Sequence, residues 1–222
     1  YQTDLVYAED FEADTGGFFS YGAVNSWQWG IPTSGPGAAH SGLRVWATNL
    51  SGYYFDYEDS YLESPDIDLS SYAGYGVKLN WWDWQETETC CDFVEVQASN
   101  DGGANWYTVY GPVWDGISEW TQHSSTLDAS YAVSNFRLRF HFYSDGSVTY
   151  PGWYIDDLTI ESDCEAQEGG LVVGNVYDSN LGTPLVGADV FNDSGFATVT
   201  QETIDPNLDE MSRTARVRVI LE

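Results

Sequence analysis

Apolar and polar side chains alternate along the chain from Phe136 to Tyr143. A period of two residues predicts a β-strand with one buried face. A short polar turn follows, and the next apolar stretch, 153–161, carries the pair Asp156-Asp157 in its first half. Two such strands at the end of a long series of similar segments predict the closing strands of an antiparallel sheet structure.

The same alternation recurs upstream, interrupted by clusters of Gly, Pro, Ser and Asp. Short strands at this spacing favour a β-sandwich over a parallel α/β sheet, and no long helical period competes with them. We therefore predict an all-β protein whose larger part is a jelly-roll sandwich. The expected strands in that part are 4–12, 27–30, 43–47, 52–56, 60–64, 75–84, 92–99, 105–110, 118–124, 135–143 and 153–161.

The chain is expected to divide into a jelly roll at 1–162, a linker at 163–170 and a small β unit at 171–222. The linker is polar and acidic and ends in two glycines. The last segment is short for an independent sandwich. Its tail, 214–221, alternates like a strand and carries basic residues. The tail therefore either pairs with an acidic edge of this or a neighbouring chain, which would allow self-association, or marks where the chain was cut.

Acidic residues outnumber basic ones by 35 to 7, which gives a formal net charge of −28. Such a chain repels phosphate backbones and anionic membrane surfaces, so nucleic-acid binding is excluded as a function class. No apolar run reaches the ~18 residues of a membrane span, so we expect no membrane insertion. The first residues resemble a strand rather than a signal peptide, so we expect a mature or excised fragment.

Three cysteines occur, Cys90, Cys91 and Cys164, and none of them forms a CxxC pair. A structural zinc site is therefore improbable. A disulfide can join Cys164 to either of the other two, or join the neighbours Cys90 and Cys91. The sequence leaves these pairings open.

Four pieces of the first domain resemble MAM-like jelly-roll domains that are appended to secreted bacterial peptidases of the immune inhibitor A type. These pieces are Glu9-Asp10-Phe11-Glu12, Trp27–Gly30 with Gly35–Gly42, Tyr61–Ser70, and Pro151–Asp157. The resemblance implies a secreted, non-catalytic module that belongs to a larger protein, with other domains of that protein as its partners.

The resemblance also implies a calcium site. In related jelly rolls an acid after the first strand and an aspartate of the last strand meet beside a His-Ser-Gly loop. Carried over, this gives Glu12 and Asp156, backbone carbonyls near Ser41, and Asp10 and Asp157 as helpers. These are the oxygen ligands that Ca²⁺ prefers. The alternative is that the acids accept backbone N–H bonds and hold no metal.

Strand alternation favours Asp156 over Asp157 as the main ligand. If Leu158 and Ile160 face the core, Asp156 shares their side of the strand. A carboxylate that points inward needs a cation or hydrogen-bond donors.

Residues 171–199 resemble the start of a carboxypeptidase-regulatory-like domain, which is a small Ig- or transthyretin-like sandwich. The likeness rests on Gly174–Asp178 and on Gly182–Ala188. After Asp209-Glu210 the pattern departs from that family, which leaves open whether the second fold is complete.

A further motif, Ser99-x-Asp101-x-Gly103-x-x-Trp106, fits the pattern of an Asp-box hairpin. Its aspartate accepts N–H groups of the turn, its glycine permits a positive φ, and its tryptophan packs beneath the turn. We expect a structural role for it.

A ligand-binding surface is expected where Trp82 and Trp84 lie on one face of the strand 75–84. The late strand carries Arg137, Arg139 and His141 on its polar face. If the two strands are neighbours, the rings and the cations together could stack a sugar or dock a protein loop. The alternative is that a loop or the second domain covers these rings.

Catalytic signatures are missing from the sequence, which contains neither His-Glu-x-x-His nor Gly-x-Ser-x-Gly. The best interpretation is a calcium-stabilised accessory module of a secreted microbial protein, expected to be a peptidase, that attaches or orients its parent. The alternatives are a domain that binds carbohydrate or matrix in adhesion, and a structural subunit of a surface layer or filament.

Overall fold

A computed structural model describes residues 4–114, 116–163, 172–174, 189–191, 197–199, 201–203 and 214–219. The chain separates into two compact units, Tyr1–Cys164 and Glu165–Glu222, and each is described by itself. The division falls inside the segment predicted as a linker.

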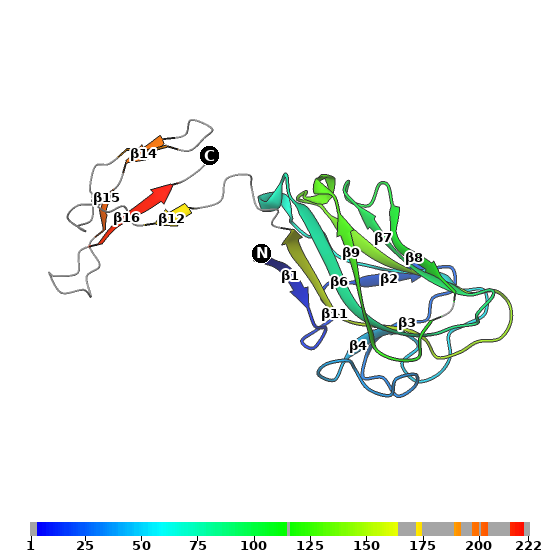
Figure 1. The fold of residues 1–222 in the computed structure, drawn as a ribbon. Coiled ribbons are helices and arrows are strands. Elements are labelled where there is room, and N and C mark those ends of the chain that lie inside the picture. The colour runs from blue at the N-terminus through cyan, green and yellow to red at the C-terminus, as the bar shows by residue number, and fades with distance from the viewer. Residues whose placement is uncertain are drawn as a thin grey trace. The chain divides into compact units, whose positions relative to one another are not determined.

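Two antiparallel sheets make up the first unit, which has the predicted all-β sandwich class (Figure 1). Sheet A has the order β3-β4-β11-β6-β9, with β1 also paired to β11, and sheet B has the order β2-β5-β10-β7-β8. The strands of sheet A are β1 (Asp4–Glu9), β3 (Trp27–Gly30), β4 (Val45–Thr48), β6 (Gly76–Glu86), β9 (Thr121–Leu127) and β11 (Gly152–Asp163). Those of sheet B are β2 (Phe19–Gly22), β5 (Asp59–Glu63), β7 (Phe93–Ser99), β8 (Tyr107–Val113) and β10 (Arg137–Tyr143).

The core lies between the two sheets and is made by the apolar sides of the alternating strands. From sheet A, Trp81 and Trp153 reach the ring of Phe140 in sheet B, with centroid distances of 6.4 and 5.4 Å. All three side chains are fully buried. Burying an aromatic side chain contributes roughly 1.5–3 kcal/mol, so this ring contact between the sheets is a main source of the sandwich's stability.

Two strand predictions were wrong. Residues 52–56 form no strand; the segment is apolar because Tyr54 packs on Phe142 in the core, at a centroid distance of 4.8 Å, from an irregular backbone. Conversely, β2 was not predicted. Two turns of 3-10 helix, η1 (Ser70–Tyr72) and η2 (Ala129–Tyr131), lie between strands.

The described part of the second unit consists of five short strands in two sheets, of order β12-β16-β15 and β13-β14. They are β12 (Val172–Gly174), β13 (Asp189–Phe191), β14 (Ala197–Val199), β15 (Gln201–Thr203) and β16 (Thr214–Val219). The predicted C-terminal strand is thus present as β16, and it pairs with β12 and β15 of its own unit. Self-association through it stays a prediction. Within the described residues, no helix has the length and apolarity that a membrane crossing requires.

Candidate functional site

The loop before β4 is joined to the last strand of the first unit by one buried carboxylate. Oδ2 of Asp156 accepts the backbone N–H groups of His40 and Ser41 at 2.9 and 3.1 Å, and Oδ1 accepts the N–H of Asp157 at 2.9 Å. Asp156 is fully buried. The two N–H bonds from His40 and Ser41 hold this loop against β11, and we call this arrangement the loop clasp.

A β-bulge gives Asp156 its direction. The pairing of β11 with β6 changes register between Asp156 and Thr159, and Asp157 has a φ of 46°. Before the bulge Ile155 faces the core, and after it Leu158 does. The expectation that Asp156 shares the side of Leu158 was therefore wrong, because the extra residue reverses the alternation. Asp156 lies on the outer face of sheet A, where the loop buries it.

Burial raises the pKa of the Asp156 carboxyl from its usual value near 4 to about 7, and the neighbouring charge of Asp157 adds to this shift. The N–H bonds from Ser41, Asp157 and His40 act in the opposite direction. Within the described residues no Lys or Arg forms an ion pair with Asp156. Its charged form therefore lacks a compensating cation.

Asp157 binds the side chains of the same two loop residues. Its Oδ2 lies 2.5 Å from Nδ1 of His40, and its Oδ1 accepts the Ser41 hydroxyl at 2.9 Å. One ligand atom each of His40, Asp156 and Asp157 lie within 4.8 Å of one another, which is close enough for a shared metal ion. Sequence reasoning did not include His40 as a ligand, although the His-Ser-Gly piece had pointed to this loop.

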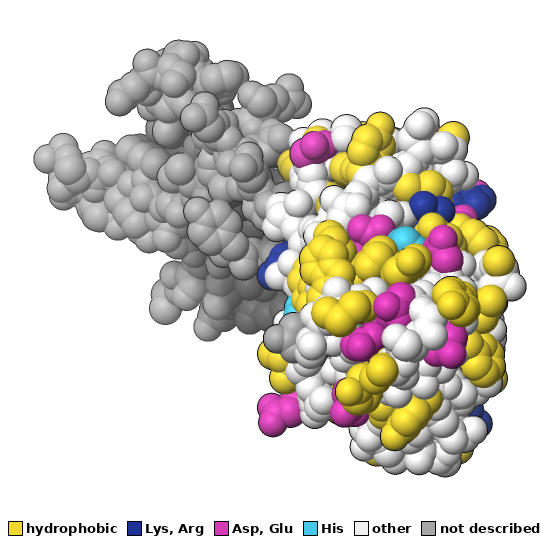
Figure 2. Space-filling view, turned by 90° about the vertical axis from the view of Figure 1, so that its right-hand side faces the viewer, with side chains coloured by type: hydrophobic (Ala, Val, Ile, Leu, Met, Phe, Trp, Pro, Cys, Tyr) yellow, Lys and Arg dark blue, Asp and Glu magenta, His cyan; other side chains and the backbone are white. Residues whose placement is uncertain are grey.

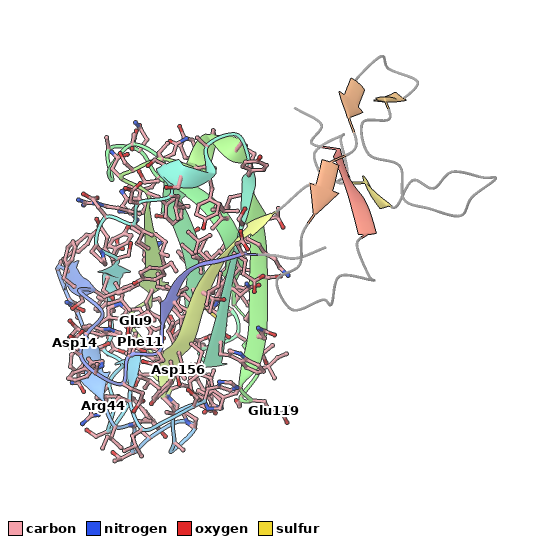
Figure 3. The ribbon with its side chains drawn as sticks, turned by 90° about the vertical axis from the view of Figure 1, so that its left-hand side faces the viewer. Glu9, Phe11, Asp14, Arg44, Glu119 and Asp156 are labelled. Atoms are coloured by element: carbon pink, nitrogen blue, oxygen red, sulfur yellow. A yellow bond between two sulfur atoms is a disulfide. The ribbon has the colours of Figure 1, made fainter. Side chains whose placement is uncertain are left out.

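Glu12 binds the other half of the loop. Its Oε1 accepts the N–H groups of Leu43 and Arg44 at 2.8 and 2.7 Å, and the Arg44 guanidinium donates to the Glu12 carbonyl at 3.0 Å. Asp10 is exposed, and its carboxylate accepts the N–H of Glu12 at 3.1 Å. Figure 3 shows Glu9 and Phe11, just before Glu12, together with Arg44 and Asp156.

The predicted calcium ligands thus divide into groups. Asp156, Asp157 and Ser41 are in mutual contact, whereas Glu12 binds the next residues of the same loop and Asp10 stabilises the turn before it. The loop donates N–H groups to both Asp156 and Glu12. The calcium site, with backbone carbonyls near Ser41 among its ligands, stays a prediction.

The proposed surface of Trp82 and Trp84 is covered by the same loop. The His40 ring stacks on Trp82 with centroids 3.8 Å apart. Trp84 is only 6% exposed and meets the ring of Tyr154 edge to face at 5.4 Å. The His40–Trp82 stack secures the loop to sheet A, and the burial of Trp84 excludes an open platform there.

Arg137, Arg139 and His141 do not lie beside these rings, and the combined surface was wrong. They belong to β10 in sheet B, whereas Trp82 and Trp84 belong to β6 in sheet A. Because the apolar residues of both strands face the shared core, the two polar faces point to opposite sides of the sandwich. The strand order, which sequence alone could not give, decides this.

The cations of β10 are instead paired within sheet B. Arg137 contacts Glu63 at 3.0 Å and Asp66 at 2.5 Å. His141 lies between Asp59 and Glu95, 2.9 Å from each. The guanidinium of Arg139 lies between the rings of Tyr61 and Trp106, 4.3 and 4.2 Å from their centroids. The side of the molecule where β7 and β8 lie accordingly mixes hydrophobic, acidic, basic and histidine side chains (Figure 2). These charged side chains therefore stabilise sheet B itself.

The Asp-box residues make the hairpin that their spacing predicts. The Asp101 carboxylate accepts the Ser99 hydroxyl at 2.8 Å and the N–H of Asn105 at 2.9 Å, and Gly103 has a φ of 90°. These bonds, with the side-chain amide of Asn105 as the largest cause, lower the pKa of Asp101 to about 2. The Trp106 ring lies beside Gly103, where an added Cβ would be 3.4 Å from it, and Arg139 lies over the ring. The motif has a structural role.

A disulfide joins Cys90 to its neighbour Cys91, and Cys164 lies outside the described residues. A second acidic group brings Glu88 and Asp92, which flank this bridge in the chain, together with Asp145 from the loop after β10. Asp92 accepts the Tyr54 hydroxyl and the N–H of Asp145, and burial raises its pKa. No spacing pattern of residues pointed to this group before the structure was known.

The chain is similar in sequence to a small part of one curated protein. No family model matches it. The chain is 34% identical to Bacillopeptidase F of Bacillus subtilis over 155 aligned residues. The aligned region covers 69% of this chain and 10% of that protein. The chain thus spans about a tenth of the length of this relative.

Two solved structures are similar in fold. The K2 cleaved adhesin domain of Lys-gingipain, a Porphyromonas gingivalis protein, is 17% identical, with a TM-score of 0.49 over 70% of this chain and 98% of that domain. The CBM22-1 xylan-binding domain from Paenibacillus barcinonensis Xyn10C is 12% identical, with a TM-score of 0.44 over 72% of this chain and 95% of that domain. The fold assignment rests on the sheet order of this chain itself.

Proposed function

We propose that the first unit is a calcium-stabilised, non-catalytic binding module of a larger secreted microbial protein of the peptidase class. It attaches or orients that protein through an extracellular glycan or protein. Its likeness to one tenth of Bacillopeptidase F supports a module within a longer chain. The strongly acidic surface, with a formal net charge of −28 for the chain, suits neutral or cationic partners and repels nucleic acid.

The loop clasp is the observation that carries this proposal. The side chains of the same loop bond to the neighbouring carboxylate: the Ser41 hydroxyl donates to Asp157, and the His40 ring contacts Asp157 as well. The hydroxyl proton is thus donated to Asp157 and not to the histidine, which is not the arrangement of an activated nucleophile. The geometry suits a site that fixes a loop rather than one that transforms a substrate.

Calcium fits the oxygen atoms that remain. A carboxylate oxygen has about two lone pairs, and Oδ1 of Asp156 uses one of them. Oε1 of Glu12 accepts two N–H groups, so the capacity of Glu12 lies on Oε2. Backbone carbonyls and water would complete the six to eight ligands. The ion would supply the positive charge that the buried carboxylate lacks, and it would stabilise the folded state by mass action.

Thermal unfolding of the full chain tests the calcium part. We expect calcium to raise the melting temperature and EDTA to reverse the increase. Asp156→Asn should abolish the response, whereas Glu119→Gln, which removes an exposed acid on β9's preceding loop, should leave it intact. An unchanged melting temperature on adding calcium and then EDTA, or a full response in Asp156→Asn, would remove calcium from the proposal.

The binding part needs a separate test. The full chain is applied to a glycan array and, in parallel, to immobilised extracellular matrix proteins. Retention on one of these surfaces supports attachment through that class of partner. Absence of retention on both surfaces contradicts the attachment role, whatever the calcium experiment shows.

A further inference from the structure

The inward face of β6 changes character halfway along the strand. Val77, Leu79 and Trp81 point into the core. The same alternation places Asp83 and Gln85 on that face, and both are buried, with exposed fractions of only 4%. A carboxylate and a carboxamide therefore occupy positions where the pattern of the strand calls for apolar residues. Buried polar groups in such positions need partners.

These two side chains line a cavity of about 220 Å³. It lies between β6 and two edge strands, β9 of sheet A and β8 of sheet B. The cavity walls are formed by Asp83, Gln85, Tyr110, Val113, Gly116, Ile117, Thr121 and His123. We call this cavity the edge pocket. It is separate from the loop clasp, which is on the outer face of sheet A.

Both carboxylate oxygens of Asp83 already have partners inside the edge pocket. Its Oδ2 accepts the indole N–H groups of Trp81 and Trp153 at 3.2 and 3.0 Å. Its Oδ1 lies 3.1 Å from Nε2 of His123. Asp83 is the only acid among the described lining residues, and both of its oxygens are bonded, so this part of the lining presents no unbonded charge to a ligand. The pocket suits a neutral ligand.

Two polar groups of the lining remain available. The Gln85 amide donates to the Thr87 hydroxyl at 3.0 Å and to the Val113 carbonyl at 3.3 Å, while its Oε1 accepts no hydrogen bond from the described residues. The Tyr110 hydroxyl likewise has no hydrogen-bond partner in the described part of the chain. Burial and the charge of Asp83 raise its pKa to about 12, so it is a neutral donor. A ligand would find both an acceptor and a donor.

We propose that the edge pocket binds one neutral sugar residue and is the glycan contact of this module. A sugar presents several hydroxyls, each of which donates and accepts, and the pocket offers His123 with Asp83 and Tyr110 with Gln85 for them. The apolar faces of the sugar ring would contact Tyr110 and Val113. The cavity is smaller than the ~300–1,000 Å³ of sites for drug-sized ligands, which fits a single ring.

This inference rests on the proposed attachment to glycans and is tested with the full chain. Saturation-transfer NMR and tryptophan fluorescence follow titrations with the methyl glycosides of galactose, glucose, xylose and N-acetylglucosamine. Lysine and arginine methyl esters serve as cationic probes. We expect at least one glycoside to bind and to perturb tryptophan fluorescence, because Trp81 and Trp153 bond directly to Asp83.

Two matched variants locate the site. Tyr110→Phe removes the hydroxyl in the pocket, and Tyr107→Phe makes the same change on the same strand at a side chain that is 54% exposed. We expect about a tenfold loss of affinity for Tyr110→Phe and no loss for Tyr107→Phe. Gly116→Ala should also weaken binding, since its Cβ would lie 2.3 Å from Cγ of Gln85 and displace that side chain.

The outcomes separate the pocket from the wider proposal. Equal glycoside affinities of Tyr110→Phe and Tyr107→Phe, with loss in Trp82→Ala, would overturn the pocket and keep a glycan-binding module. Binding of the amine esters without any glycoside would overturn the sugar class. Failure of every glycoside to bind overturns the pocket, and the array and matrix results then decide whether attachment itself survives.

Discussion

Glu12 and Asp156 bind successive N–H groups of one loop. Asp156 accepts those of His40 and Ser41, and Glu12 accepts those of Leu43 and Arg44. Glu12 follows β1, the first strand of the unit, and Asp156 belongs to β11, its last strand. The loop therefore joins the two ends of the sandwich's chain, and its shape depends on both carboxylates.

Gly42, between the two halves of that loop, should tolerate no side chain. Its φ is 57°, and a Cβ would lie 2.3 Å from the Glu12 carboxyl carbon. Gly37 has a similar φ of 69° but nothing within 4 Å of a Cβ, so Gly37→Ala measures backbone strain alone. We expect Gly37→Ala to cost about 1 kcal/mol and Gly42→Ala about 2–4 kcal/mol in urea unfolding. Equal losses would mean that the contact with Glu12 contributes nothing.

In the presence of EDTA, the free energy of unfolding should fall with rising pH. The pKa of Asp156 is about 7 in the folded state and near 4 in the unfolded chain. Between these values the folded state holds a proton that the unfolded state releases, so the free energy of unfolding decreases as pH rises from about 4 to about 7. The full decrease is about 4 kcal/mol, at 1.36 kcal/mol per pKa unit.

Urea unfolding at several pH values in EDTA, with Asp156→Asn alongside, measures this effect. Because other groups titrate as well, the informative quantity is the difference between the two pH profiles. Saturating calcium should reduce that difference, since an ion stabilises the charged carboxylate. Parallel profiles of the two proteins in EDTA would show that Asp156 does not titrate in this range.

Much of the sandwich could be predicted because alternation is a local property. The stripe Leu138, Phe140 and Phe142 identifies β10 and its buried face without knowledge of its neighbours. The bulge at Asp157 could not be predicted in this way, because one extra residue leaves each flanking alternation intact and changes only their relation. The direction of Asp156 was therefore misjudged although its strand was correct.

The candidate site was predictable only in part for a similar reason. The family resemblance brought Glu12, Asp156 and the loop at Ser41 together, but which backbone groups of that loop face the acids depends on its dihedral angles. The placement of Arg139 beside Trp82 failed because it required two strands, β10 and β6, to be neighbours. Strand order depends on long-range pairing, which a single strand's pattern does not record.

Arg139 should not be replaceable by lysine. Its guanidinium lies between the rings of Tyr61 and Trp106, and it donates to Gln97 at 2.6 Å and to the Tyr21 hydroxyl at 3.1 Å. A planar guanidinium can stack and donate at once, whereas an ammonium keeps the charge and loses this geometry. We expect Arg139→Lys to lower the free energy of unfolding by about 1–2 kcal/mol. If Arg139→Lys matches the wild type while Arg139→Gln is destabilised, charge alone is what matters.

Reduction of the disulfide should have little effect on stability. The bridge joins adjacent residues, Cys90 and Cys91, so it closes almost no loop of the unfolded chain. A bridge from Cys164 to either residue would instead enclose a loop of more than 70 residues, and its loss would cost about 4 kcal/mol in the chain-entropy model. Thermal unfolding with and without a phosphine reductant distinguishes the two pairings, with Cys164→Ser as the matched control. A large drop in melting temperature on reduction of the wild type, absent in Cys164→Ser because that variant is already destabilised, would assign the bridge to Cys164. A small and equal change in both proteins is the result that the adjacent pairing requires.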